Sequence, residues 1–150
     1  MKQMALDVAL APEPTLAGFV PAGNAAAVQH VRLWSEGRTR MPVPLYLWGP
    51  AGAGKTHLLR GAAHALREQG LAVGWLDAAA PPRQPFDPAW DAVLLDDVQT
   101  YGPELQHTAF NWFINAVTPT DGRPRAVLAA GHVPPADLPL RDDLRTRLGW

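Results

Sequence analysis

The strongest constraint on this chain is one glycine-rich segment between an apolar run and a helix-like stretch. The segment reads Gly49-Pro50-Ala51-Gly52-Ala53-Gly54-Lys55-Thr56 and fits the pattern G-x-x-x-x-G-K-[ST]. The run 45–48 precedes it, and residues 55–69 follow with apolar side chains at helical spacing. Because glycines let successive backbone N–H groups turn toward one anion, this context indicates a phosphate-binding P-loop rather than a ligand-free turn.

The residue types in this segment predict a division of roles around a nucleotide. The backbone of residues 49–54 would surround the phosphates, and Lys55 would reach the β- and γ-phosphates. The hydroxyl of Thr56 would coordinate Mg²⁺. We therefore expect a nucleoside polyphosphate with Mg²⁺ as the cofactor.

A second apolar run, residues 92–95, ends in the acid pair Asp96 and Asp97, which is typical of a Walker B strand. Nucleotide hydrolysis needs one carboxylate for the Mg²⁺ shell and one acid that orients and activates water. Asp96 fits the first role and Asp97 the second. The competing interpretation is that the two acids cap the following helix.

The remaining chain predicts an α/β fold in which helices flank a parallel sheet. We expect strands at 45–48, 71–77, 91–97 and 125–130, and helices at 24–35, 55–69 and 104–117, with a short charged helix near the end. Alternation of strands and helices favours βαβ units with right-handed crossovers. Residues 1–14 read as an extended, proline-punctuated tail.

Composition excludes several classes of function. The chain has thirteen basic and fourteen acidic residues, so its net charge is −1. It therefore lacks the excess of positive charge that is typical of proteins that bind nucleic acids strongly. There are no cysteines, and the histidines are scattered, so we expect no metal beyond Mg²⁺. No apolar run is long enough to span a membrane, and the N-terminus does not read as a signal peptide, so we expect a cytoplasmic protein without membrane contact.

Four segments carry a family resemblance. They are Gly49–Thr56 followed by His57-Leu58-Leu59, then Leu94-Leu95-Asp96-Asp97-Val98, then Pro134-Pro135, and finally Arg147-Leu148-Gly149-Trp150. Together they resemble the ATPase domain of the bacterial replication initiator DnaA, and residues 15–24 are similar to the segment that opens that domain. The resemblance implies an AAA+ domain over residues 15–150 that binds ADP or ATP.

Within that family, the chain resembles the Hda group, the regulatory inactivators of DnaA. In its tail, Gln3 matches the polar anchor of a clamp-binding peptide, and Met4, Leu6 and Val8 match the apolar plugs. An extended peptide of this kind suits a groove on a partner surface. The resemblance therefore implies the sliding clamp, the β subunit of DNA polymerase, as a partner.

The resemblance to the Hda group also implies a function. Hda proteins dock on the DNA-loaded clamp and stimulate hydrolysis of DnaA-bound ATP, which prevents reinitiation. Arg147 matches the arginine finger, a group that acts in trans on the γ-phosphate held by another subunit. The resemblance therefore implies DnaA as a second partner. It implies contact with DNA only indirectly, through the clamp, and it is compatible with a homodimer.

Two departures from the family pattern affect these expectations. His132 stands where initiators carry an acid, which implies at most weak ATPase activity of the chain's own. The sequence stops at Trp150, before the fifth core strand and the helical lid. In the usual strand order 5-1-4-3-2, we therefore expect residues 45–48 to form an exposed edge, and we expect weak nucleotide binding.

Three rival functions remain open at this point. An AAA+ helicase loader or transposition ATPase of the DnaC-like group shares both nucleotide motifs but has no clamp peptide. A small P-loop kinase would need basic residues for its substrate, and the loop 81–88 offers Arg83 alone. A scaffold without nucleotide would not need Lys55 or the acid pair.

Overall fold

The computed structural model describes residues 2–5, 31–32, 35, 44–49, 54–81 and 83–148. Several sequence expectations lie outside these residues. They are the domain-opening segment at 15–24, most of the helix at 24–35, the loop residues Pro50, Ala51, Gly52 and Ala53, and the plugs Leu6 and Val8.

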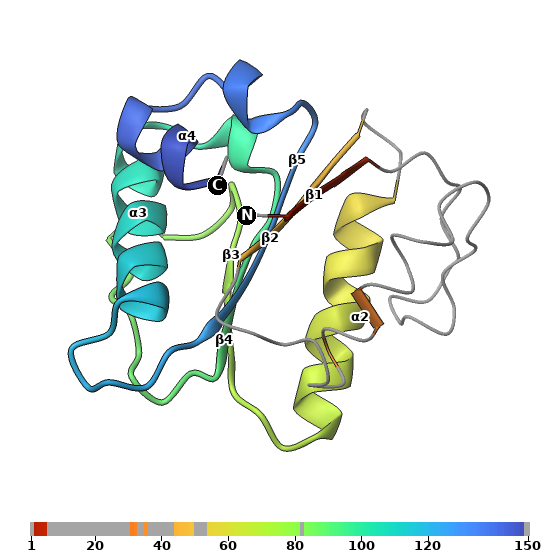
Figure 1. The fold of residues 1–150 in the computed structure, drawn as a ribbon, viewed down its shortest axis with the longest axis vertical. Helices are drawn as coiled ribbons and strands as arrows, with labels where there is room; N and C mark the ends of the chain where they lie inside the picture. The colour runs from red at the N-terminus through yellow and green to blue at the C-terminus, as the bar shows by residue number, and fades with distance from the viewer. Residues whose placement is uncertain are drawn as a thin grey trace.

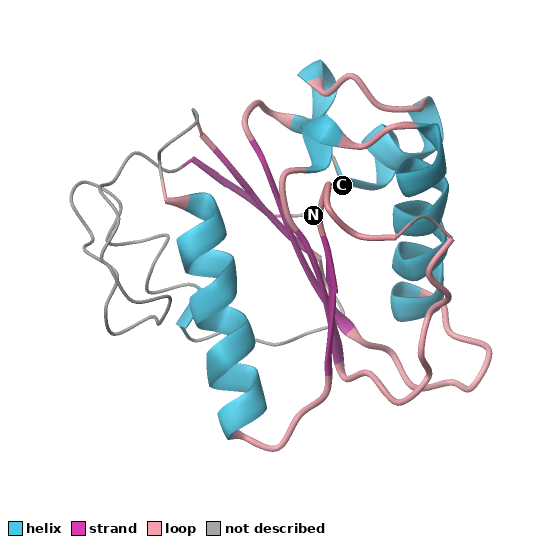
Figure 2. Ribbon diagram, turned by 180° about the vertical axis from the view of Figure 1, so that it is seen from behind, coloured by secondary structure: helices cyan, strands magenta, loops and turns pink. Residues whose placement is uncertain are grey.

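The described residues form three layers with a parallel sheet in the middle. The strands are β1 (Lys2–Ala5), β2 (Leu45–Trp48), β3 (Val73–Leu76), β4 (Ala92–Leu95) and β5 (Ala126–Gly131), in the spatial order β1-β2-β5-β4-β3. Helix α2 (Lys55–Glu68) covers one face of the sheet, and α3 (Pro103–Val117) and α4 (Asp142–Leu148) lie on the other (Figure 1). Figure 2 shows the same layers from behind. The predicted fold class, a parallel sheet flanked by helices, is confirmed.

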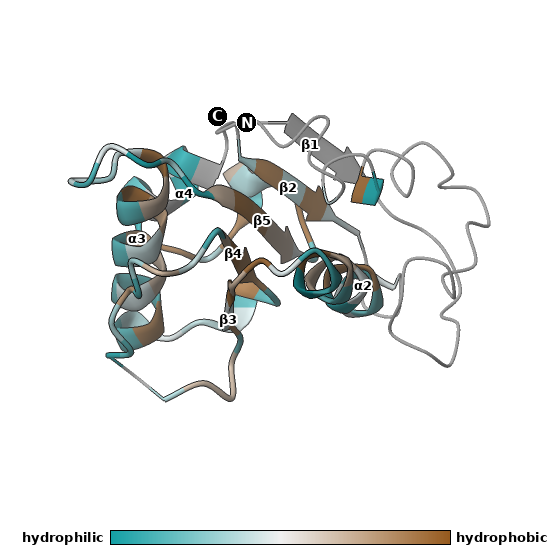
Figure 3. Cartoon of the chain, turned by 90° about the horizontal axis from the view of Figure 1, so that it is seen from below, coloured by the Kyte–Doolittle hydropathy of each residue, from teal (hydrophilic) through white to brown (hydrophobic). Residues whose placement is uncertain are grey.

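The sheet is apolar along whole strands because both of its faces are covered. All residues of β4 and β5 are buried, including small alanines that let helices approach closely. Figure 3 shows the apolar colouring of these strands between helices whose outer surfaces are more polar. Continuous apolar strands of this kind are expected for parallel sheets between two helical layers.

Each face of the sheet has its own hydrophobic core. The α2 side buries the helix positions that the sequence predicted, namely Leu58, Leu59, Ala62, Ala63 and Leu66. The α3 side buries Ala109, Phe113 and Ala116, as expected, and also Trp112. The indole of Trp112 donates to the carbonyl of Gln84 at 2.9 Å, so this large side chain ties the loop 83–88 to the helix.

Helix boundaries follow local residue chemistry. Gly70 has a φ of 78°, the left-handed conformation that ends α2 and that glycine adopts without strain. Pro103 occupies the first turn of α3, where its missing N–H has no intrahelical partner. Both boundaries were predicted from the sequence.

The edge of the sheet next to β2 is not exposed as the sequence predicted. We expected residues 45–48 to be an exposed edge, and this is wrong, because β1 pairs with β2 in parallel from Lys2↔Leu45 to Ala5↔Trp48. An open strand edge offers unpaired N–H and C=O groups, and an extended segment free of proline satisfies them. The N-terminal segment thus takes the place that the fifth core strand holds in the usual order.

Within the described residues, no helix has both the length and the apolar character needed to cross a membrane.

Candidate functional site

The candidate site lies where β2 and β4 end and α2 begins. Both strands are neighbours of β5 and run parallel to it, so their carboxyl ends meet at one edge of the sheet. Gly49 follows β2, Lys55 begins α2, and Asp96 follows β4. In α/β sheets, ligands bind in the crevice beyond the carboxyl ends of the strands. The sheet topology therefore brings together the two motifs that the sequence singled out.

A direct hydrogen bond joins the two motifs. The hydroxyl of Thr56 donates to Oδ2 of Asp96 at 2.7 Å. Thr56 lies in the first turn of α2 and Asp96 follows the end of β4. The hydrogen bond between them therefore shows that the start of the helix and the end of the strand are in direct contact. The arrangement that the sequence required is present.

Asp96 is a buried carboxylate with one oxygen left over. The residue is 3% exposed, and its Oδ1 is buried without a hydrogen-bond partner among the residues that the structure describes. Burial raises the pKa of Asp96 to about 6; the hydroxyl of Thr56 opposes this rise, and the neighbouring charge of Asp97 adds to it. Buried polar atoms in folded proteins nearly always have a partner, and carboxylate and hydroxyl oxygens are ligands that Mg²⁺ accepts. The residues present therefore fit a magnesium ion or one of its waters.

Lys55 lies inside the turn between β2 and α2. Its ammonium is buried and donates to the carbonyl of Gly49 at 2.6 Å, which ties the end of β2 to the start of the helix. Burial lowers the pKa of Lys55, while the charges of Asp97 and Asp96 act in the opposite direction. The two carboxylates thus favour the charged form of the ammonium, which is the form that can bind an anionic ligand.

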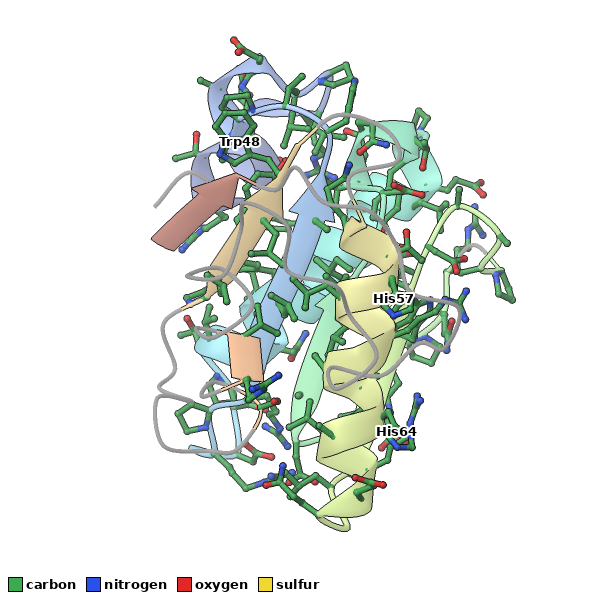
Figure 4. The ribbon with its side chains drawn as sticks, turned by 90° about the vertical axis from the view of Figure 1, so that its right-hand side faces the viewer. Trp48, His57 and His64 are labelled. Atoms are coloured by element: carbon green, nitrogen blue, oxygen red, sulfur yellow. The ribbon has the colours of Figure 1, made fainter. Side chains whose placement is uncertain are left out.

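The start of α2 is suited to an anion. Gly54 has a φ of 95° and gives the helix no side-chain cap, and the first turn carries no acidic residue. The first N–H groups of a helix lack intrahelical partners and carry the positive end of the helix dipole. Of the histidines on α2, His57 lies nearer to this end than His64 does (Figure 4).

Asp97 has an unusual backbone conformation. Its φ of 51° and ψ of 49° are left-handed, which is uncommon and strained for a residue other than glycine. The side chain makes no capping bond to the 3₁₀ turn Val98–Thr100, and α3 is preceded by Gly102 instead. The capping interpretation of the acid pair is therefore wrong. Strained residues of this kind concentrate at functional sites.

Two residues near the acids escaped the sequence reasoning. Gln99 donates to Oδ1 of Asp97 at 3.4 Å, and its own Oε1 is buried without a partner. Tyr101 is buried and donates to the carbonyl of Leu76 at 2.9 Å; burial, with the nearby charge of Asp96, raises the pKa of Tyr101. The sequence signal that could have indicated Gln99 and Tyr101 was their position two and four residues after Asp97.

The ends of β2 and β5 are closely packed. Gly49 donates its N–H to the carbonyl of Gly131 at 3.3 Å, and the hydroxyl of Tyr46 donates to the carbonyl of Val133 at 2.7 Å. A Cβ on Gly131 would lie 2.2 Å from the Tyr46 oxygen, so a side chain does not fit there. His132, the residue that departs from the family pattern, is exposed immediately after this contact.

The remaining predicted residues lie apart from the phosphate end of α2. Arg147 is partly buried on α4, which packs against α3 on the other face of the sheet (Figure 1). Gln3 and Met4 lie in β1, on the far side of β2 from β5. The structure thus brings Lys55 near the acid pair, it places the predicted finger on the other face of the sheet, and it places Gln3 and Met4 in an edge strand whose last pair is Ala5↔Trp48.

Comparison with known proteins adds a fold family. No protein-family model matches the sequence. The structure is similar to the replication initiator DnaA bound to AMPPCP and single-stranded DNA, with a TM-score of 0.71, 25% identity and coverage of 93% of this chain and 48% of that one. It is also similar to domain III of DnaA from Thermotoga maritima, with a TM-score of 0.70, 24% identity and coverage of 94% and 65%. This chain has the AAA+ fold of the DnaA domain.

The AAA+ assignment agrees with the strand order described above. The strands β2, β5, β4 and β3 follow the 1-4-3-2 part of the usual order, and β1 stands in the fifth place. The chain spans about half the length of the DnaA chain bound to AMPPCP. A third similar structure, protein NMB1076 from Neisseria meningitidis, is 32% identical, with coverage of 72% of this chain and 70% of that one and a TM-score of 0.50.

Proposed function

We propose that the chain binds ADP or ATP with Mg²⁺ at the carboxyl ends of β2 and β4. The observation that supports this most is the Thr56–Asp96 hydrogen bond, with the unpartnered Oδ1 of Asp96 next to it. The similar DnaA structure bound to AMPPCP supports an adenine nucleotide. The proposal includes all of the loop, 49–56, of which Gly49 and 54–56 are described.

Each residue has a distinct task in this proposal. Lys55 exchanges its bond with the Gly49 carbonyl for the β- and γ-phosphates, and the first N–H groups of α2 bind phosphate oxygens. Thr56 and Asp96 hold the magnesium ion, which neutralises phosphate charge when bound. Asp97 orients water. Because His132 is exposed and no acid stands in its place, the chain's own hydrolysis is weak.

The biological role that we propose is regulation of replication initiation. The tail residues Gln3, Met4, Leu6 and Val8 bind the DNA-loaded sliding clamp, and Arg147 reaches the γ-phosphate of ATP held by DnaA. Support comes from the resemblance to the Hda group and from the DnaA-like fold. Stimulated hydrolysis of DnaA-bound ATP then prevents reinitiation.

A reconstituted assay of DnaA-bound ATP hydrolysis, with and without clamp on DNA, tests this role. We expect stimulation that needs both clamp and Arg147, so Arg147→Ala loses it while keeping nucleotide and clamp binding. The matched control is Arg60→Ala, an exposed arginine on the opposite helical layer, which should retain full stimulation. Full stimulation by Arg147→Ala would refute the finger.

The alternative role is a helicase loader or transposition ATPase of the DnaC-like group. The DnaA structure with single-stranded DNA gives this alternative one supporting observation, since that protein binds a DNA strand. The two roles differ in a simple binding experiment. Retention by immobilised clamp, lost in Gln3→Ala, supports the regulator, whereas binding of single-stranded DNA without clamp supports the loader.

A further inference from the structure

One short segment has two incompatible uses. Gln3 and Met4 belong to the proposed clamp peptide, and the structure pairs them with Tyr46 and Leu47 as part of β1. A peptide bound in a partner's groove and a strand in a sheet both need the extended backbone of the same residues. We take these two uses of Lys2–Ala5 to be mutually exclusive.

We propose that β1 is a removable strand whose release is required for clamp binding. In the free protein, Lys2–Ala5 pair with β2; in the clamp-bound protein, they leave β2 and enter the clamp groove. This inference rests on the proposed clamp function and adds a conformational condition to it. It also predicts that clamp binding uncovers the edge of β2.

The pairing of β1 has the features of a strand that can be exchanged. It is four residues long, lies at the edge of the sheet and, among the described strands, pairs with β2 alone. A ladder of this length adds few hydrogen bonds, each of modest net strength because water replaces them on release. Edge strands are also the places where sheets exchange partners.

The position of the pairing links it to the candidate site. The last pair is Ala5↔Trp48, and Trp48 precedes Gly49, the first residue of the P-loop. Figure 4 shows Trp48 at the carboxyl end of β2, beside the tip of β1. The released edge would thus lie next to the nucleotide, on a surface that the free protein covers.

A disulfide lock tests the exchange. The chain has no cysteine, so Ala5→Cys combined with Trp48→Cys creates a single pair, and neighbouring parallel strands lie within disulfide reach. Ala5 lies within the proposed clamp peptide but is neither its polar anchor nor one of its apolar plugs, and Trp48 lies outside the peptide. The probe is purified sliding clamp on a biosensor surface, with the reduced form of the same variant as the matched control and a synthetic peptide of residues 1–10 as the unrestrained ligand.

We expect the peptide to bind the clamp most tightly, the reduced protein roughly tenfold more weakly because release must precede binding, and the oxidised protein not at all. Equal binding of the oxidised and reduced forms, or failure of the cysteines to oxidise, overturns the removable strand and leaves the clamp function standing. If neither peptide nor protein binds, the clamp function itself fails, and the removable strand fails with it.

Discussion

The two ends of the sheet each contain a buried charged residue. The two residues differ in how completely their side chains are hydrogen-bonded. Asp96, at the carboxyl end of β4, receives one hydrogen bond from Thr56 and keeps one oxygen unpartnered. Arg125, just before the amino end of β5, is 1% exposed, and all three of its guanidinium nitrogens donate hydrogen bonds. Its guanidinium donates to both carboxylate oxygens of Asp121, at 2.8 and 2.7 Å, and to the carbonyls of Pro88, Trp90 and Arg123, and it lies 5.2 Å from the Phe86 ring centroid.

The difference separates a structural charge from a site. A buried ion is tolerated when its hydrogen bonds are complete, and removal of that ion then leaves its polar partners without their bonds. A buried ion with incomplete bonding destabilises the fold unless a ligand completes it. We therefore assign Arg125 to the fold and Asp96 to a ligand, and the following predictions test that contrast.

The largest effect is expected at Arg125. Arg125→Ala removes a large buried side chain and leaves the carbonyls of Pro88, Trp90 and Arg123 without their donor, so it should lower the free energy of unfolding by about 3–5 kcal/mol, measured by urea denaturation. Arg123→Ala is the control, because Arg123 is 48% exposed in its side chain and pairs with Asp91 at the surface. A loss below about 1 kcal/mol is expected there. Equal losses in both variants would contradict the contrast.

The next effect has the opposite sign. Asp96→Asn should raise the free energy of unfolding of the nucleotide-free protein at pH 7.5 by about 3 kcal/mol, since a raised pKa means that burial disfavours the charged form. At the same time, the variant should lose Mg²⁺-dependent nucleotide binding. Differential scanning calorimetry and a nucleotide titration measure the two. A destabilised Asp96→Asn protein would place Asp96 with the structural charges.

The pH dependence of that effect follows from the same shift. The pKa of Asp96 is raised from 3.8 to about 6, so the folded state binds the proton more tightly. The stabilisation is therefore full below about pH 4 and is lost as the pH rises through about 6. The advantage of Asp96→Asn over wild type should grow over that interval, measured as the difference in melting temperature at each pH. An advantage that stays constant would refute burial of the charged carboxylate as its cause.

The smallest effect is expected at Asp121, and its pH slope is reversed. Pairing with Arg125 and a backbone bond from Arg123 lower the pKa of Asp121 from 3.8 to about 2. Its contribution is present above pH 4 and is lost as the pH falls toward 2. The difference in melting temperature between wild type and Asp121→Asn should thus shrink on acidification. A difference that widens in acid would show that another contact is responsible.

The sequence predicted the site better than its surroundings. Strand-like runs before Gly49 and Asp96 fixed both motifs at carboxyl ends, and parallel neighbours bring such ends together, so the Thr56–Asp96 contact was predictable. The helix boundaries at Gly70 and Pro103 were predictable because each residue acts locally. Each of these successes rests on a pattern that can be recognised within a short stretch of sequence.

The failures depend on long-range contacts. The pairing of Lys2–Ala5 with β2 depends on an open edge, and no local pattern in the tail reports it. The left-handed backbone of Asp97 and the complete bonding of Arg125 arise from loops that meet in three dimensions. In the sequence, Arg125 read as the first residue of a strand.

The central claim is that the end of the sheet with the incomplete charge binds a magnesium nucleotide. Equilibrium titration of a fluorescent ADP or ATP analogue, with Mg²⁺ or with EDTA, tests it directly. We predict saturable binding that EDTA weakens, that Lys55→Ala weakens roughly tenfold or more, and that Arg60→Ala leaves unchanged. A folded wild-type protein that binds no adenine nucleotide, or binds it equally well without Mg²⁺ and without Lys55, would contradict the account.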